Sequence, residues 1–323
     1  MDQSITGYTD DSNFTSPVLV FDNVHMVFKR GVKKPVQALR GMDLTIPSGA
    51  VVGLLGPNGC GKTTALSCML GLLFPQNGEI SLWGKPVEKA SVQDKTLLVG
   101  AVLEDTRLPP FLTVKKLLSL VCEMRRIPGA QVKNEMERVI SITGIEPLLD
   151  LRINALSKGQ ARKVSVATAL TGDPPLLVMD EPASGLDVSA RIEFNNLVRR
   201  LRDGKRTILI TSHLLSDIEN TCTHIAIMLK GEIMAFDKTG HLIDAGGNDE
   251  IDIFIHEKHM EVLNRLGLSF SSSEYRQLVA LDLSGRPDYE ILGLLAANQI
   301  APKRIEPRDN LITYYLSVTE NEE

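Results

Sequence analysis

The sequence has few cysteines and no long hydrophobic run. Its four cysteines, in 323 residues, form no CxxC pair and no zinc-binding spacing, so we expect reduced thiols rather than disulfides or a structural zinc site. No stretch approaches the roughly 20 apolar residues of a membrane-spanning helix. Residues 1–16 are polar and do not have the pattern of a signal peptide. If the protein works at a membrane, we expect another chain to provide the membrane part.

An excess of basic residues is also missing. The chain has 35 Lys and Arg against 40 Asp and Glu, a net charge of −5. Because proteins that bind nucleic acid usually present a basic face, no nucleic-acid partner is expected. Hydrophobic residues make up 43% of the chain, which is enough for a well-buried core, and the length allows two domains.

The order of segments indicates a large α/β domain over residues 17–245, after a disordered tail at 1–16. Short apolar strands alternate there with helical segments, which is typical of a mostly parallel sheet. Strands are predicted at 18–28, 50–55, 97–103, 176–179, 207–211 and 224–229. A helical insertion is predicted at about 105–170, with helices at 114–126 and 132–143, and this block has 11 basic and 6 acidic residues.

A small C-terminal α+β domain is predicted at 246–323, after a linker that begins at Gly246 and Gly247. This segment is acidic, with 14 Asp and Glu against 7 Lys and Arg. Its predicted order is strand 251–255, helix 257–266, strand 277–283, helix 287–298 and strand 303–306. That order is close to a split βαβ, or ferredoxin-like, module.

A glycine-rich segment fits the phosphate-loop pattern GxxxxGK[ST]. Its residues, called the phosphate loop below, are Gly56, Pro57, Asn58, Gly59, Cys60, Gly61, Lys62 and Thr63. It follows the apolar run 51–55 and precedes a predicted helix at 63–72, which is the context that the motif requires. Glycine lets the backbone close around an oxyanion, and the helix N-terminus adds positive potential.

The phosphate loop predicts a nucleotide site with magnesium. Lys62 is expected to reach the β- and γ-phosphates, Thr63 to bind Mg²⁺ through its hydroxyl, and Thr64 to bond the α-phosphate. Cys60 is either a tolerated small side chain or a redox-sensitive position.

Two further strands end in polar residues. The strand at 176–179 leads into Asp180 and Glu181, and the strand at 207–211 leads to His213. Ligands of α/β folds bind at the carboxyl ends of the strands. We therefore expect Asp180 to hold Mg²⁺, Glu181 to act as general base toward the attacking water, and His213 to contact the γ-phosphate.

The segment Leu156-Ser157-Lys158-Gly159-Gln160 resembles the signature LSGGQ of the ATP-binding cassette (ABC) ATPases. Residues 184–187, which end in Asp187, resemble the D-loop of that family, and His213 resembles its switch histidine. The resemblance covers about residues 17–245. It implies a P-loop NTPase fold of the ABC type, with a RecA-like core and a helical insertion, and the hydrolysis of ATP with Mg²⁺.

The resemblance also implies partners. Ser157, Gly159, Gln160 and Asp187 would contact ATP bound to a second ATP-binding subunit that faces the first head to tail, and a homodimer is favoured. An integral membrane permease subunit would contact the helical insertion. The expected location is cytoplasmic, peripheral on the cytoplasmic face of the membrane.

Three positions depart from the family pattern. Lys158 replaces a glycine and either adds charge near the partner's phosphates or is a solvated lysine. Glu104 replaces a glutamine and either contacts the metal or the attacking water, or only forms the hinge of the insertion. Phe28 stands at the position of the aromatic residue that stacks on adenine, and since Val24 and Met26 alternate with it, the alternative is a core phenylalanine.

The spacing of the motifs favours a transporter subunit. From Lys62 to Asp180 there are 118 residues, and the chain has a single cassette; long coiled coils or paired cassettes mark the relatives that act on chromosomes or in translation. Glu104 and the segment 305–316 resemble export-type cassettes, so an exporter is expected. The alternatives are a soluble non-transport ABC ATPase and a regulatory nucleotide-binding module.

Overall fold

The computed structural model describes residues 17–28, 35–104, 107–245, 251–273, 277–282, 288–307 and 315. The chain divides into two compact units, 1–239 and 240–323, and each is considered by itself. The division precedes the expected linker at 246–249, which lies outside the described residues, as does most of the segment 305–316. No helix in the described ranges is long and apolar enough to cross a membrane.

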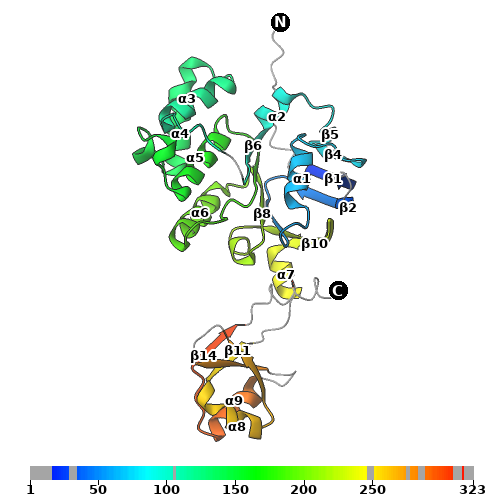
Figure 1. Cartoon of the computed structure of the whole chain (residues 1–323), viewed down its shortest axis with the longest axis vertical. Helices are drawn as coiled ribbons and strands as arrows, with labels where there is room; N and C mark the ends of the chain where they lie inside the picture. The colour runs from blue at the N-terminus through cyan, green and yellow to red at the C-terminus, as the bar shows by residue number, and fades with distance from the viewer. Residues whose placement is uncertain are drawn as a thin grey trace. The chain divides into compact units, whose positions relative to one another are not determined.

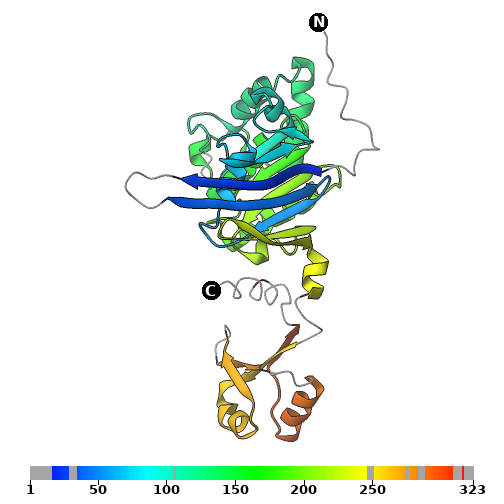
Figure 2. The same ribbon diagram turned by 90° about the vertical axis from the view of Figure 1, so that its right-hand side faces the viewer.

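An antiparallel sheet begins the first unit, with strand order β2-β1-β4-β5. Figure 2 shows its two long strands running side by side. The bounds are β1 (Pro17–Phe28), β2 (Val36–Pro47), β4 (Asn77–Leu82) and β5 (Lys85–Pro86). The sequence analysis did not predict β2, although Met42, Leu44 and Ile46 are buried on one face in the two-residue period of a strand.

The second sheet carries the chemistry and has the strand order β10-β9-β3-β8-β7-β6. Its bounds are β3 (Val51–Leu55), β6 (Val99–Val102), β7 (Leu176–Met179), β8 (Thr207–Ser212), β9 (His224–Leu229) and β10 (Glu232–Lys238). All neighbours are parallel except β10 and β9. The predicted strand at 97–103 was wrong at its start, because residues 97 and 98 end the helix α2 (Val92–Leu98).

Helices form the insertion and flank the sheet. Figure 1 shows α3 (Val114–Met124), α4 (Gly129–Thr143) and α5 (Lys158–Leu170) gathered on one side, beside β6. Short 3-10 turns at Glu146–Leu148 and Ile153–Ala155 connect α4 to α5. The other helices of this unit are α1 (Lys62–Met69) and α6 (Val188–Leu201), and a 3-10 turn, η3 (Leu215–Asp217), follows β8. Helix α7 (Thr239–Ala245) begins at the division between the two units.

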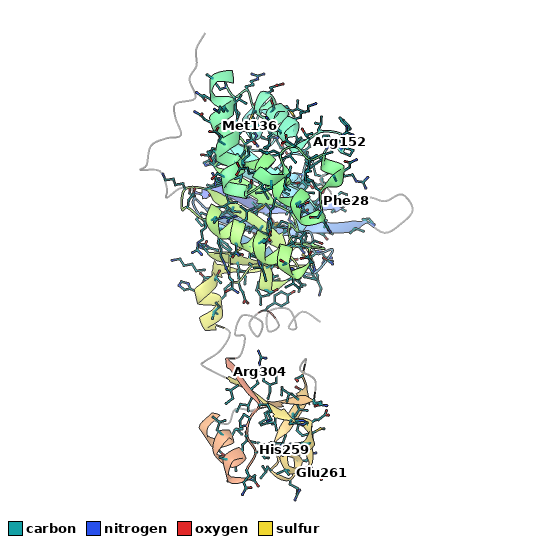
Figure 3. All side chains as sticks on the ribbon, turned by 90° about the vertical axis from the view of Figure 1, so that its left-hand side faces the viewer. Phe28, Met136, Arg152, His259, Glu261 and Arg304 are labelled. Carbon is teal, nitrogen blue, oxygen red and sulfur yellow. The ribbon has the colours of Figure 1, made fainter. Side chains whose placement is uncertain are left out.

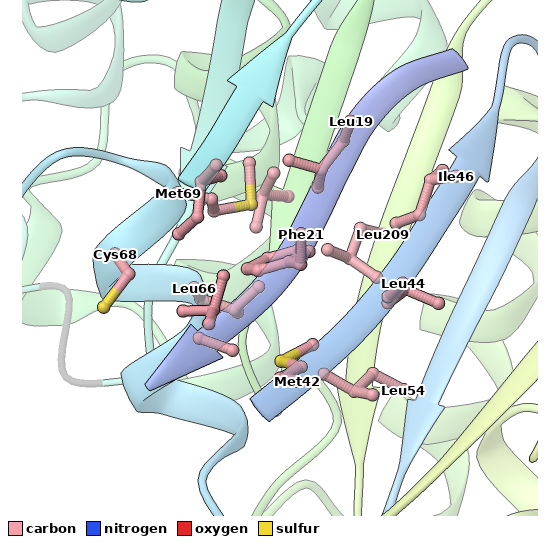
Figure 4. Close-up of a cluster of buried hydrophobic side chains, with 14 of the residues drawn as sticks. Leu19, Phe21, Met42, Leu44, Ile46, Leu54, Leu66, Cys68, Met69 and Leu209 are labelled. Carbon is pink, nitrogen blue, oxygen red and sulfur yellow. The ribbon is translucent and has the colours of Figure 1, made fainter. Parts of the chain in front are cut away.

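A shared hydrophobic core joins the two sheets. Figure 4 shows Phe21 from β1, Met42 from β2, Leu54 from β3 and Leu66 from α1 converging in it. All four side chains are at most 2% exposed. Because β3 and α1 are both anchored there, the loop that connects them has a fixed position.

The second unit is a four-stranded antiparallel sheet with order β12-β13-β11-β14. Its elements are β11 (Ile251–His256), a 3-10 turn (Glu257–His259), α8 (Met260–Arg265), β12 (Ser269–Ser272), β13 (Leu278–Asp282), α9 (Asp288–Ala297) and β14 (Arg304–Pro307). The first and third strands are central, as in a split βαβ module. Figure 3 labels His259, Glu261 and Arg304 in this unit. The sequence analysis missed β12, whose three serines lack a strand signature.

Candidate active site

Three parallel strands bring the predicted site residues to one edge of the second sheet. β3 pairs with β8, and β8 pairs with β7, so the carboxyl ends of all three strands lie together. The phosphate loop leaves β3, Asp180 and Glu181 follow β7, and His213 follows β8. A hydrogen bond of 3.2 Å from the Gly56 amide to the Ser212 carbonyl ties the phosphate loop to β8.

Two positions of the phosphate loop accept only glycine. A Cβ at Gly56 would lie 2.3 Å from the Met228 carbonyl oxygen, and one at Gly61 would lie 2.4 Å from the Ala38 carbonyl oxygen. Gly61 also has a φ of +117°. At these two glycines the backbone of the loop is therefore packed too closely for any side chain. The loop leads directly into the N-terminus of α1, where the first amides have no partner inside the helix. Such a helix end suits an anion.

Lys62 is buried inside the loop, at 5% exposure. Its Nζ donates to the Gly56 carbonyl at 2.6 Å and the Pro57 carbonyl at 3.2 Å, and it pairs with Oε1 of Glu181 at 3.3 Å. A buried ammonium needs such partners because its desolvation is costly. These contacts hold the Lys62 ammonium at the position where it would meet a phosphate bound by the loop. That phosphate would replace the present partners of the ammonium.

Glu181 joins the lysine to the histidine. Its Oε2 lies 2.7 Å from Nδ1 of His213, and the carboxylate is buried. The backbone of Glu181 has a φ of +44°, a left-handed conformation that costs a non-glycine residue about 1–3 kcal/mol. The structure thus brings together Lys62, Glu181 and His213, the three residues predicted to be catalytic, and holds the central one in a strained backbone conformation.

Thr211, which the sequence analysis missed, supports both acids. Its buried hydroxyl donates to Oδ1 of Asp180 at 2.6 Å and accepts from the Glu181 amide at 2.8 Å. The other oxygen of Asp180, Oδ2, is buried and has no hydrogen-bond partner among the described residues. A carboxylate with one open oxygen suits a hard cation such as Mg²⁺. A sequence signal existed, because Thr211 lies two residues before His213 along the same strand direction.

Cys60 has a packing role in the phosphate loop. It is 5% exposed, and a Cβ at Gly56 would lie 2.7 Å from its Sγ. Burial raises the pKa of the Cys60 thiol, and the charge of Lys62 only partly opposes this. A thiol that stays protonated reacts slowly, so the geometry favours a tolerated small side chain over a redox-sensitive position.

The remaining predicted ligands lie around this centre. Thr63 is exposed and Thr64 is half-buried, both in the first turn of α1. Phe28, labelled in Figure 3, ends β1 and is half-buried against the core, so one part of its ring surface packs and another is open. Glu104 is exposed, two residues after the end of β6.

Arg162 on α5 is a second residue that the sequence analysis missed. It is 8% exposed and donates to the Leu103 carbonyl at 3.3 Å, next to Glu104. Burial lowers the pKa of its guanidinium, and the carboxylates of Glu104 and Asp180 oppose that shift. The charge of Arg162 therefore acts on the two carboxylates, Glu104 and Asp180, that were predicted to face the metal.

The signature residues cap a helix. Ser157 Oγ accepts from the Gln160 amide at 3.2 Å, and Gln160 Oε1 accepts from the Ser157 amide at 2.9 Å, forming a capping box at the start of α5. Asp187 caps α6 through a single hydrogen bond, in which its side chain accepts from the Ala190 amide at 2.9 Å. In the part of the chain that the structure describes, these side-chain hydrogen bonds stay within each residue's own helix rather than reaching Lys62, Glu181 or His213.

The signature packs on the turn 184–187 of the same subunit. A Cβ at Gly159 would lie 3.0 Å from Cβ of Ala190, and a Cβ at Gly185 would lie 2.2 Å from Nζ of Lys158. Gly185 also has a φ of +64°. Lys158 thus covers the turn, with its side chain exposed overall.

Comparison with known proteins identifies the family of the chain. The family model described as "ABC transporter" matches residues 39–184. The chain is 34% identical, over 66% of its length and 70% of the relative's, to the Nod factor export ATP-binding protein I of Cupriavidus metallidurans. It is 32% identical, over 62% of its length and 82% of the relative's, to the ABC transporter ATP-binding protein NatA of Bacillus subtilis.

Solved structures share the fold. One is cbiO1 from Clostridium perfringens, part of the ABC transporter complex cbiONQ. It superimposes with a TM-score of 0.64 at 25% identity, over 78% of this chain and 96% of that one. The match concerns the arrangement of the sheets and helices.

Proposed function

The chain belongs to the ATP-binding subunits of ABC transporters and hydrolyses ATP, and on this basis we propose that two copies close around ATP to drive export through a separate membrane permease. The observation that carries the proposal is the contact of Lys62, Glu181 and His213 at the sheet edge, beside the open oxygen of Asp180.

In this proposal the phosphate loop holds the substrate. The amides of the loop and of the first turn of α1 donate to the phosphates, and Thr64 bonds the α-phosphate. Lys62 exchanges its carbonyl partners and Glu181 for the β- and γ-phosphates, which releases the Glu181 carboxylate. Phe28 offers the open part of its ring to adenine.

Asp180, Thr63 and Glu104 are the residues that would hold Mg²⁺. The open Oδ2 of Asp180 and the exposed position of Thr63 fit an ion with oxygen ligands. The ion, when bound, neutralises negative charge that develops on the phosphates. The positive charge of Arg162 acts on Glu104 and Asp180 and partly offsets the negative charge of these two carboxylates.

Glu181 then acts as general base. Its carboxylate accepts a proton from the water that attacks the γ-phosphorus, while the bond to the ADP oxygen breaks. His213 holds that carboxylate through Nδ1, at 2.7 Å, and keeps its other ring nitrogen for the γ-phosphate. The left-handed backbone of Glu181, pinned by Thr211, sets the direction of the side chain.

The second copy completes the site through its signature. In the capping box the Ser157 oxygen accepts from the Gln160 amide, which leaves the hydroxyl proton of Ser157 free to donate to the γ-phosphate held by the partner. The Gly159 amide, at the positive end of the 13-residue helix α5, donates beside it. Asp187 places the turn 184–187 at the same surface, which would face the second copy. ATP thus joins the copies, and its hydrolysis lets them separate.

The helical insertion is the proposed docking surface for the permease. Large apolar side chains are exposed there, namely Phe111, Leu120, Met124 and Leu151. A hydrogen bond of 3.1 Å from the Val114 amide to the Leu151 carbonyl joins the start of α3, which carries Leu120 and Met124, to the segment that carries Leu151. Exposed apolar groups of this kind mark interaction sites. Export is favoured because relatives such as the Cupriavidus protein are named for export. The chain would then lie on the cytoplasmic face of the membrane.

Glu181→Gln tests the proposal. The amide cannot accept the proton, so phosphate release should fall at least about 100-fold, while Mg²⁺ and ATP should give a stable dimer in size-exclusion chromatography with light scattering. Glu137→Gln, on the exposed face of α4, is the matched control and should behave as the unmodified protein. A variant that stays monomeric at saturating nucleotide contradicts the dimer, and undiminished hydrolysis removes Glu181 from its role.

The permease is tested separately. Purification of the full chain in mild detergent should recover an integral membrane protein. Substituting Phe111 and Met124 by serine should lower that recovery and leave ATP binding unchanged. Recovery of soluble partners alone would favour a non-transport ATPase.

A further inference from the structure

The turn after His213 is fastened to helix α6 through a carboxylate and an arginine. Asp217, the last residue of η3, is 9% exposed. Its Oδ1 lies 3.5 Å from Nε of Arg191 on α6, and its Oδ2 accepts from the Ser212 hydroxyl at 3.3 Å. The hydrolysis described above does not use Asp217 or Arg191.

Ser212 connects this pair to the histidine. It directly precedes His213, and its Oγ accepts from the Leu214 amide at 3.0 Å, so the hydroxyl closes a tight turn around His213. The single hydroxyl proton is shared between the Leu214 carbonyl, at 3.1 Å, and the Asp217 carboxylate, at 3.3 Å. The position of Asp217 therefore bears on the conformation of His213.

Arg191 connects the pair to the turn 184–187. Its amide donates to the Asp187 carbonyl at 2.9 Å, in the first turn of α6. A continuous set of contacts thus runs from that turn through Arg191 and Asp217 to Ser212, His213 and finally Glu181. These contacts connect the turn 184–187, which would face a second copy, with Glu181, the proposed general base.

The contact between Asp217 and Arg191 is only partly made. Within the described residues, neither Oδ1 of Asp217 nor Nε of Arg191 has a hydrogen-bond partner, although both atoms are buried. A cavity of about 10 Å³ lies beside Asp217, lined also by Ser212 and Thr211. A buried, loosely paired charge is costly, so a shorter contact between the two groups would stabilise both.

We infer that Asp217 and Arg191 are positioning residues for ATP hydrolysis: they hold the turn after β8 against α6 so that His213 meets the Glu181 carboxylate. The inference rests on the roles proposed above for Glu181 and His213. If Asp217 and Arg191 have this role, the position of His213 depends on the position of the turn 184–187. A partner that contacts this turn would then also affect His213.

The test measures ATP hydrolysis by the full chain as release of radiolabelled phosphate, which remains measurable after a large fall in rate. Asp217→Asn and Arg191→Gln should each lower kcat at least about tenfold, because misplacement of a catalytic group by ~1 Å has effects of this size, with KM for ATP within about twofold. Arg191→Lys, which keeps the charge, should restore most of kcat. Lys163→Gln, which breaks an ion pair between α5 and Glu193 of α6, is the control and should keep the rate.

A double substitution separates this inference from the proposed function. If Asp217 acts through His213, Asp217→Asn should lower kcat little further in a His213→Ala protein. A full additional tenfold loss there, or unchanged kcat in both Asp217→Asn and Arg191→Gln, overturns the inference alone. Undiminished hydrolysis in His213→Ala overturns both it and the proposed role of His213. The Arg191 side chain is 32% exposed, so we expect its variants to fold even if Asp217→Asn does not, and a thermal unfolding curve of each variant checks this.

Discussion

Replacing Thr211 by valine should destabilise the first unit strongly, although the two side chains have almost the same shape. The hydroxyl is 0% exposed and serves two buried groups, Oδ1 of Asp180 at 2.6 Å and the Glu181 amide at 2.8 Å. A hydrogen bond to a charged group contributes about 1.5–3 kcal/mol, and an unpaired buried amide costs about 1–3 kcal/mol. We expect a loss of about 3–5 kcal/mol in the free energy of unfolding.

The assay is urea unfolding followed by the fluorescence of Trp83, the only tryptophan, which packs against the core of the first unit and reports on that unit alone. Thr211→Ser is the control, because it keeps the hydroxyl and loses only a methyl group, worth about 1 kcal/mol. Hydrolysis should fall in the valine variant, since Asp180 and Glu181 lose their shared support. A loss below about 1 kcal/mol for valine, or equal losses for valine and serine, would refute the reasoning.

Three other perturbations have expected outcomes. Ser157→Ala removes the capping box of α5 and should lower the free energy of unfolding by about 1 kcal/mol in the same urea assay. Gly185→Ala places a Cβ on a residue with a φ of +64° and should cost about 1 kcal/mol or more, whereas Gly129→Ala, with open space around its Cβ, should cost nothing. Burial raises the pKa of Cys68 to about 11, so at pH 8 the thiol stays protonated, and alkylation by iodoacetamide should be at least about 100-fold slower than in urea.

Each of these has a result that would contradict it. A Ser157→Ala protein as stable as the unmodified one would show that the cap does not support α5. Equal costs for the two glycine substitutions would mean that the backbone conformation at Gly185 does not limit the side chain. Rapid labelling of Cys68 in the folded protein, identified by peptide mass spectrometry, would mean that the first unit opens locally around α1.

Residues that act through nearby backbone were predicted well from the sequence. The phosphate loop is one continuous segment between β3 and α1. The spacing of its glycines, Lys62 and Thr63 is therefore enough to predict its geometry. The strands β7 and β9 were predicted with their observed bounds, because buried parallel strands are continuous apolar runs. Strands whose signal is interrupted were missed. In β2, a register shift at Gly41 breaks the alternation, and β12 is mostly serine.

Residues that act across the sheet were harder to predict. Thr211 looks like an ordinary strand threonine until β7 and β8 are paired, which places its hydroxyl between the two acids. Arg162 looks like a surface residue of an amphipathic helix, and only the packing of α5 against β6 buries it beside Leu103. In both cases the partner is dozens of residues away, and no local pattern shows which residue that partner is.

The sequence by itself determined the family, the chemical types of the reacting groups and their order along the chain, because each motif is a short continuous segment with a recognisable residue pattern. Only the tertiary structure decided which groups touch: that Lys62 and His213 share the Glu181 carboxylate, that one oxygen of Asp180 stays open, and that Asp217 meets Arg191. The reason is physical. Burial makes an unpaired charge costly, and which charges are buried together depends on how the strands and helices pack, not on their separation in sequence.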